Sequence, residues 1–202
     1  MPDSQPIVIR SLGTPLACGA YILRIDLSHP THLSFGRFKG GKEIELNAGS
    51  YLYIGSAMAR KGSTSLAHRL RRHAKRSGSR PTHHIHSALV QHLQNIALLP
   101  LPAAARAPKR LHWNVDYVLD LQTAALTAVY LLHSNANLEE SLAEFFSHAN
   151  EAIVFEQGLG ANDAPGHTHL LYINAEPAWW LSLGDRLASE FYAEQLRISK
   201  PY

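Results

Sequence analysis

Two strand-like stretches, GAYILRIDL at residues 19–27 and SYLYIGSA at residues 50–57, decide the fold. In each stretch apolar and polar side chains alternate with a period of two, which is typical of a strand that is buried on one face. Between them, HLSFGRFKGGKEIEL (32–46) indicates two short strands about a Lys39-Gly40-Gly41-Lys42 turn, because paired glycines supply the positive φ angles of tight hairpins. We therefore expect four short strands before the first helix.

The first helix is predicted over residues 66–75, where Leu66, Leu70 and Ala74 recur at helical spacing and the other faces carry arginines and histidines. Ser63 or Thr64 is its expected N-cap. Farther along, the patterns predict a second helix within residues 83–98, strands at 115–121 and 125–132, a helix from 138 to about 149 capped by Asn137, a strand at 170–173 and a helical tail at 183–198.

These elements predict a mixed α/β (α+β) domain with a small, mainly antiparallel central sheet flanked by helices. The proline-containing N-terminus is expected to pair loosely at best, and the C-terminal helix either caps the fold or makes a dimer contact. The predicted divisions are an N-terminal leader at 1–16, the main domain at 17–174 with a proline-rich insertion at about 77–110, and a C-terminal helical extension at 175–202.

The composition excludes several classes of protein. The chain has 202 residues, of which 46% are hydrophobic and 17% charged, so it can bury a sizeable core. No apolar run approaches the roughly 20 residues that span a bilayer, and no secretory signal is visible, which favours a cytoplasmic location without membrane contact. The lone cysteine, Cys18, excludes an intramolecular disulfide and a cysteine-based zinc cluster.

Positive charge is concentrated in one segment. The net charge is only +3, but residues 60–80 contain eight basic residues and no acid, so the rest of the chain, with eleven basic and sixteen acidic residues, carries −5. Clustered cations of this kind favour a nucleic-acid face, because they release counterions from phosphates. The alternative is a solvated helix face without a partner. The predicted nucleic-acid-binding residues are Arg60, Lys61, Arg71, Arg72, Lys75 and Arg76.

Candidate catalytic groups lie on the same elements. Tyr21 and Tyr53 sit on the two deciding strands, and Arg69 and His73 project from one face of the cationic helix at i and i+4. Phosphodiester hydrolysis needs a base to activate water, a cation to neutralise the phosphoryl oxygens and usually a metal held by a carboxylate. The combination of these residues favours that chemistry, whereas each of them alone is more typical of packing or of a solvated surface.

The motifs AYI (20–22) and YIG (53–55), followed by LAHRLRRH (66–73), resemble the GIY-YIG nuclease superfamily. The order of the further segments KRLHWNVDY, LEESLA and GLGANDAPGHTHLLY is similar to a prokaryotic subgroup catalogued as a domain of unknown function and sometimes fused to DNA-repair enzymes. The resemblance covers about residues 17–174. It implies a metal-dependent endonuclease that hydrolyses DNA phosphodiester bonds by water attack, with Mg²⁺ or Mn²⁺ as cofactor.

The resemblance also implies the site residues. Tyr21 and Tyr53 line the site, and one of them, with preference for Tyr53, helps to deprotonate the attacking water. Arg69 steadies the scissile phosphate, and His73 assists proton transfer or holds the nucleophile. Glu139 is implied as catalytic residue and metal ligand, with its neighbour Glu140 as the second possibility. A single carboxylate suffices for Mg²⁺, which keeps several waters and binds substrate phosphate.

The chain departs from the subgroup at two places. Asn114 replaces a histidine, and two cysteines are missing from the loop before Thr168-His169-Leu170. A nucleic-acid-binding module of the same fold without turnover is therefore the main alternative function, and a histidine-rich metal-handling protein is a third. Duplex, branched, damaged or single-stranded DNA, RNA, and the oligomeric state are all left open by the sequence.

Other histidines and tryptophans permit two interpretations each. Four polar residues could form a second small metal cluster or could brace a loop, and the second interpretation is favoured. These residues are His112, Asp116, Asp163 and His169. The HHIH segment at 83–86 and His92 are expected to belong to a helix rather than to a metal site. Trp179 and Trp180 are expected to pack rather than to stack on bases.

Overall fold

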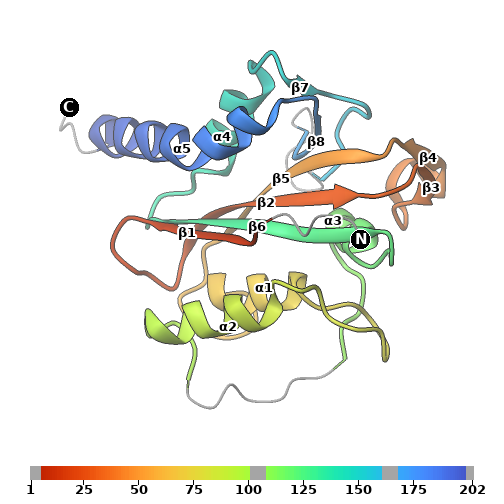
Figure 1. Ribbon diagram of the computed structural model, residues 1–202. Coiled ribbons are helices and arrows are strands. Elements are labelled where there is room, and N and C mark those ends of the chain that lie inside the picture. The colour runs from red at the N-terminus through yellow and green to blue at the C-terminus, as the bar shows by residue number, and fades with distance from the viewer. Residues whose placement is uncertain (1–5, 101–107, 161–167, 199–202) are drawn as a thin grey trace.

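The protein, described here from a computed structural model, contains a six-stranded sheet and a two-stranded sheet (Figure 1). The structure describes residues 6–100, 108–160 and 168–198. The large sheet has the order β1-β6-β2-β5-β8-β7; β1 and β6 run parallel, and its other neighbouring strands are antiparallel. Its strands are β1 (Val8–Leu12), β2 (Gly19–Leu27), β5 (Gly49–Ala57), β6 (Ala124–His133), β7 (Ala152–Ile153) and β8 (Leu170–Ile173), and the small sheet pairs β3 (Thr31–Ser34) with β4 (Glu43–Leu46).

Helices cover both faces of the large sheet. In Figure 1, α1 and α2 lie below the sheet and α4 and α5 lie above it. The helices are α1 (Leu66–His73), α2 (His86–Asn95), α3 (Asn114–Leu119), α4 (Glu139–Ser147) and α5 (Pro177–Ile198), and a short 3-10 helix, η1, spans Phe38–Gly41. None of the helices in the described ranges is long and apolar enough to cross a bilayer. The predicted fold class, a mainly antiparallel sheet flanked by helices, is confirmed.

The sheet separates two apolar layers, because successive side chains of a strand point to opposite faces. From β2, Tyr21 and Leu23 enter the layer that also contains the buried residues of α1, α2 and α3. Ala20 and Ile22 enter the layer below α4 and α5, to which α5 contributes Leu183, Leu187 and Phe191. The C-terminal helix thus caps the sheet of its own chain.

Most of the predicted elements are present, and four predictions need correction. Residues 115–121 were expected to form a strand, but the chain forms α3 there, because Val115, Val118 and Leu119 are buried at helical spacing. The leader contains β1, which pairs with β6 over five residues. The N-cap of α1 is Ser65 rather than Ser63 or Thr64. The last helix begins at Pro177, six residues earlier than expected.

Candidate active site

The two strand tyrosines and the helix histidine meet where β2 and β5 face α1. Tyr21 pairs with Gly55 and Leu23 with Tyr53 across the antiparallel β2–β5 ladder, so the two tyrosines are diagonal neighbours on one face of the sheet. The ring centroids of Tyr21 and Tyr53 are 6.2 Å apart, and His73 lies 5.6 Å from the first and 6.2 Å from the second. Tyr21 and His73 are fully buried, and Tyr53 is 3% exposed.

Gly55 makes room for the ring of Tyr21. A Cβ atom at Gly55 would lie 2.5 Å from both the Cζ and the Oη of Tyr21, which is far inside normal van der Waals contact. Only a glycine can therefore stand opposite Tyr21 in this register while the ring keeps its place. This packing accounts for the glycine of the YIG motif in this chain without any direct chemical role for it.

A buried chain of hydrogen bonds runs from Asp116 through His73 to Tyr21. The Nδ1 atom of His73 is 3.3 Å from Oδ1 of Asp116, and Nε2 is 3.0 Å from the hydroxyl of Tyr21. Since a carboxylate only accepts, Nδ1 carries the proton and donates it to Asp116. Nε2 of the neutral ring then accepts the hydrogen bond from the Tyr21 hydroxyl. The carboxylate thus sets the tautomer that leaves a basic nitrogen facing the phenol.

The buried carboxylate of Asp116 is stabilised by several hydrogen bonds and ion pairs from other groups of the protein. It accepts hydrogen bonds from the backbone N–H groups of His112 and Trp113, at 2.9 and 3.0 Å, and forms ion pairs with Arg72 at 2.8 Å and Lys109 at 3.3 Å. Burial by itself would raise the pKa of Asp116, but the hydrogen bond from His73 and the charges of Lys109 and Arg72 outweigh it and hold the pKa well below its usual range. Asp116 is therefore an anion at any ordinary pH.

Burial also keeps His73, Tyr21 and Tyr53 neutral. Desolvation and the positive charges of Lys109 and Arg72 together lower the pKa of His73 to about 4, against the opposing effect of Asp116. Burial raises the pKa of both tyrosines, and the negative charge of Glu139 acts in the same direction, whereas the charge of Arg69 lowers both values. At neutral pH the site therefore holds a neutral imidazole and two neutral phenols.

We expect the free energy of unfolding to fall between about pH 6.5 and pH 4 because of His73. Its pKa is about 4 in the folded protein against about 6.5 for an ordinary histidine, so in this window the unfolded chain binds a proton that the folded protein does not bind. The contribution is complete above pH 6.5 and is lost as the pH falls. His83, whose pKa burial and Arg76 lower to about 3, acts in the same sense.

Denaturant titrations at several pH values in this window measure the effect. His73→Gln removes one titrating group while keeping a polar side chain, so the variant should lose less stability than the wild type on acidification. His83 is retained and should leave a residual slope. Equal pH slopes for the variant and the wild type would contradict the buried neutral imidazole.

Arg69 reaches from α1 to the end of β5. Its guanidinium donates a hydrogen bond to the backbone oxygen of Ser56, and its Cζ lies 4.3 Å from the ring centroid of Trp113. Trp113 holds the guanidinium of Arg72 in the same manner, at 4.4 Å. Such cation–π contacts fix the direction of a guanidinium without neutralising it. Arg69 therefore presents an oriented positive charge beside Tyr21.

Glu139 approaches the same point from the other side of the sheet. The Ser56 hydroxyl donates a hydrogen bond to Oε2 of Glu139, and Nδ1 of His169 is 3.0 Å from Oε1. Burial raises the pKa of Glu139, but the hydrogen bonds of His169 and Ser56 and the charges of His169 and Arg69 lower it below its usual value. Glu139 is thus a partly exposed anion that acts electrostatically on both tyrosines.

The sheet edge explains how a residue of α4 reaches groups on the α1 side. β8 pairs with β5 over Ser50–Tyr53, and the backbone oxygen of His169 accepts the next hydrogen bond, from Ile54. Beyond that point β5 continues to Ala57, and Ser56 contacts both Arg69 and Glu139. All five predicted catalytic residues therefore lie around the end of β5.

Glu139 fits the minimal requirements of a Mg²⁺ ligand. It is ionised, and its side chain is 23% exposed. Mg²⁺ commonly uses one or two protein carboxylates and completes its shell with water and substrate phosphate. Within the described residues there is no group of three or more potential metal ligands, which leaves Glu139 as a single-carboxylate candidate. Its neighbour Glu140 is exposed.

The basic residues predicted to bind nucleic acid differ in their surroundings. Arg60 and Lys61 are exposed, and Arg60 also donates to the side chain of Asn135 at 3.1 Å. Arg76 donates hydrogen bonds to the backbone oxygens of Leu121, Pro81 and Ala124. Arg72 is paired with Asp116, as described above. Arg71 is 8% exposed, and Lys75 is half-buried. The cationic helix therefore has structural as well as surface roles.

The four residues considered as a second metal cluster do not gather among the described residues. His169 contacts Glu139, Asp116 contacts His73, and His112 is exposed, while Asp163 lies outside the described residues. For Asp116 the bracing interpretation agrees with the geometry, because its carboxylate holds the start of α3.

The HHIH segment was expected to belong to a helix, but α2 begins at His86, so His83 and His84 precede the helix, whereas His92 lies within it. His83 is buried; Nε2 lies 2.9 Å from the backbone oxygen of Leu119, and Nδ1 accepts from the N–H of Leu126 at 3.1 Å. Trp180 packs in the apolar layer below α4 and α5, and Arg24 stacks on it at 4.0 Å. Both tryptophans of this pair therefore belong to the face opposite the cationic helix.

Several residues that organise the site were not predicted to belong to it, and Asp116 and His169 were interpreted only as braces of a loop or as ligands of a second metal. Asp116, Ser56 and Trp113 set the orientation of His73, Glu139 and Arg69 respectively, and His169 is a direct partner of Glu139. Asp116 and Trp113 lie in the segment KRLHWNVDY, whose order among the motifs was the available signal. Nothing local distinguishes Ser56 from other strand serines.

A family model described as a domain of unknown function, DUF123, matches residues 20–181. The matched range contains Tyr21, Tyr53, Arg69, His73 and Glu139, and also Asp116. A search of the curated proteins and a search of the solved structures found no match.

Proposed function

The chain belongs to the family of domains of unknown function DUF123, and we propose that it is a metal-dependent endonuclease of the GIY-YIG type that hydrolyses phosphodiester bonds in DNA. The observation that carries the proposal is the convergence of five residues from four elements, β2, β5, α1 and α4, around the end of β5. A cation, an anion and a proton-accepting chain meet there, which is the minimal set for phosphoryl hydrolysis. The resemblance of AYI and YIG to the motifs of that superfamily supports the same function.

Proton transfer is assigned to Tyr21 and His73. As the water oxygen bonds to phosphorus, a water proton passes to the Tyr21 oxygen and the phenolic proton passes to Nε2 of His73, 3.0 Å away. Asp116 stabilises the imidazolium that forms. The bond between phosphorus and the leaving oxygen breaks, and that oxygen later receives a proton. The hydrogen-bond chain thus favours Tyr21, rather than Tyr53, as the phenol that activates water.

Arg69 stabilises the negative charge on the phosphoryl oxygens, since Trp113 and the Ser56 backbone oxygen already hold its guanidinium in place. Glu139 would hold Mg²⁺ or Mn²⁺. When bound, such an ion neutralises phosphate charge and lowers the pKa of coordinated water. Ser56 and His169 keep the Glu139 carboxylate oriented. DNA as the partner and the cytoplasm as the location are parts of the same proposal.

A nucleic-acid-binding module without turnover is the second candidate function. It is favoured by the burial of the reactive groups, because Tyr21 and His73 are fully buried and Tyr53 is 3% exposed. Water and phosphate reach these groups only if the surrounding side chains move. Cationic side chains on α1 would still bind phosphates in such a module.

Two assays on the full chain separate these functions. Supercoiled plasmid incubated with Mg²⁺ or Mn²⁺ should be nicked, and EDTA should stop the reaction. Binding of labelled DNA at increasing salt measures the second property, and its affinity should fall as salt rises. Salt-sensitive binding without product at any metal concentration would refute the endonuclease and support the module. Tight transition-metal binding with indifference to DNA would refute both.

A further inference from the structure

Three pockets form one continuous groove beside the candidate active site. The first, of about 270 Å³, lies against α1, and it shares Ser63, Arg72 and Pro108 with a second pocket of about 490 Å³. The second shares His112 with a third pocket of about 430 Å³. The three together make a path from α1 to the loop that precedes β4, which is longer than one small ligand needs.

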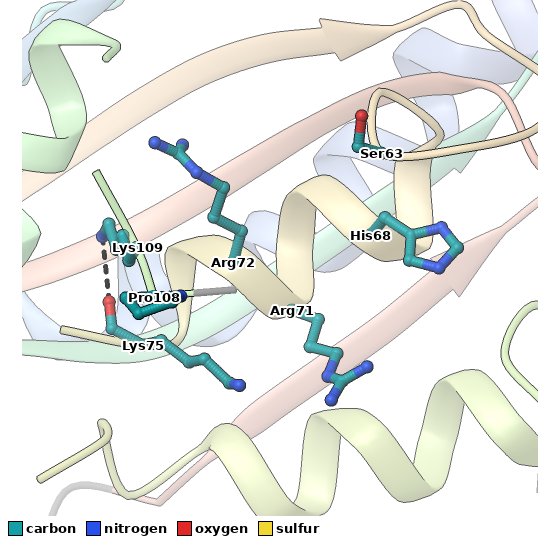
Figure 2. Close-up of a pocket in the computed structure, with 7 residues that line it drawn as sticks. All are labelled: Ser63, His68, Arg71, Arg72, Lys75, Pro108 and Lys109. Carbon is teal, nitrogen blue, oxygen red and sulfur yellow. Dashed lines mark hydrogen bonds between the residues drawn. The ribbon is translucent and has the colours of Figure 1, made fainter. Parts of the chain in front are cut away.

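The α1 end of the groove is cationic. Figure 2 shows Arg71 and Lys75 projecting from one side of α1 and Arg72 from the other, with Lys109 nearby. Arg72 and Lys109 both pair with Asp116, whose single negative charge compensates part of their positive charge. Arg71 and Lys75 repel each other: burial lowers the pKa of Lys75, and the charge of Arg71 lowers it further. None of the described residues that line the three pockets is acidic. This end of the groove therefore carries positive charge, which favours an anionic ligand.

The far end of the groove is aromatic. Phe35, Phe38 and Tyr117 line the third pocket, together with the cationic side chain of Arg37. The rings of Phe35 and Tyr117 are 6.3 Å apart, and Gly36 allows their approach, because a Cβ there would lie 2.5 Å from the Tyr117 hydroxyl. The volume of the third pocket, about 430 Å³, falls in the range of small-molecule pockets, roughly 300–1,000 Å³.

The middle of the groove touches the candidate active site. Trp113 lines the second pocket, and its ring carries the guanidinium of Arg69 and lies 5.6 Å from the ring of His73. A chain of phosphates that follows the groove from α1 to the aromatic pocket would therefore pass Trp113, whose ring contacts the guanidinium of Arg69.

We propose that this groove binds an unpaired strand of nucleic acid, with its phosphates along Lys75, Arg71 and Arg110 and one unstacked base in the pocket of Phe35, Phe38 and Tyr117. Proteins that bind single strands combine a positively charged groove, which follows the phosphates, with aromatic side chains on which the bases stack. Any base can stack in this way, because every base has a π-face. A base inside a duplex cannot enter the aromatic pocket without being flipped out, which costs a few kcal/mol. The inference rests on the proposed function and names its substrate class: single-stranded or locally unpaired nucleic acid.

Fluorescence anisotropy in EDTA tests binding apart from cleavage. The probes are a labelled single-stranded DNA oligonucleotide, the same sequence as RNA, and its blunt duplex. We expect the single strands to bind at least about tenfold more tightly than the duplex, which corresponds to the stacking of one base. The RNA arm distinguishes the two sources of an unpaired strand. Equal or tighter binding of the duplex would overturn the inference.

Two variants probe the two ends of the groove. Phe38→Ala should weaken single-strand binding about fivefold or more, through lost stacking. Lys75→Ala should weaken single-strand and duplex binding alike and reduce the salt slope by about one. Arg186→Ala is the matched control, since Arg186 stacks on Trp179 on the opposite face of the sheet and should leave binding unchanged.

A fluorescent base analogue reports the pocket directly. A single 2-aminopurine in the oligonucleotide should change its emission on binding, and Phe38→Ala should reduce this change. Arg37→Ala, at an exposed residue, is a second variant that does not disturb the core. Single-strand affinity unaffected by both variants would overturn the groove assignment. Preferred single-strand binding without cleavage would uphold the groove and refute only the endonuclease.

Discussion

Replacement of Arg69 by alanine is expected to lower the rate of Mg²⁺-dependent DNA nicking by about two to three orders of magnitude. Removal of one preorganised group that stabilises transition-state charge typically has an effect of this size. The guanidinium is held by the Ser56 backbone oxygen and by the Trp113 ring, so the substitution removes a charge that is already oriented. Single-turnover nicking at saturating protein measures the chemical step apart from binding.

Controls separate this role from folding and from general charge. Arg69→Lys keeps the charge but loses the planar group that stacks on Trp113, and it should recover only part of the rate. Arg186→Ala removes a positive charge from the opposite face and should nick at the wild-type rate. Thermal unfolding of each variant checks that the fold is kept. Undiminished nicking by Arg69→Ala would refute the assigned site.

Asp116→Asn is expected to destabilise the folded protein by about 3–5 kcal/mol, because it removes one member of a buried charge cluster. Asparagine has nearly the same shape, but it leaves the positive charges of Arg72 and Lys109 buried without compensation. In either orientation of the amide its NH2 group also faces donors: the N–H groups of His112 and Trp113 at one position, or His73 Nδ1 and the Lys109 amine at the other. Urea or guanidinium unfolding at neutral pH gives the free-energy difference.

Asp185→Asn is the matched control for the charge change. The side chain of Asp185 is 79% exposed and pairs with Arg10 at 2.7 Å on the surface, so the same substitution there should cost less than about 1 kcal/mol. Similar losses for the two variants would mean that Asp116 does not serve as the counter-ion of the cluster. Asp116→Asn should also slow nicking wherever it remains folded, because the tautomer of His73 is no longer fixed.

The strands that form the site could be predicted from the sequence because their burial is one-sided. β2 matches the predicted range, and β5 is longer by one residue, Gly49. The i and i+4 spacing of Arg69 and His73 was enough to place both on one face of α1. Their position beside the tyrosines was predicted from the order of the motifs along the chain, and no single motif would have predicted it.

Other features depended on long-range contacts that the sequence does not contain locally. VDYVLDL satisfies both a strand pattern and a helical one, and the chain becomes α3 because Val115, Val118 and Leu119 pack into the layer that contains the buried residues of α1 and α2. β1 follows Pro6 and is an edge strand, so it has only one neighbour, β6, to specify it. The partnership of Ser56 with Glu139 joins residues that are 83 positions apart in the sequence.

Ser56 connects the two apolar layers of the protein at the candidate active site. Its backbone oxygen is bound by the guanidinium from one layer, and its hydroxyl is bound by the carboxylate from the other. Each half has its own apolar core and can accumulate substitutions independently of the other. A substitution that shifts α4 on the sheet, however, would move Glu139 and, through Ser56, would also affect the position of Arg69. The distance between the negative and the positive charge that a phosphate would meet would then change.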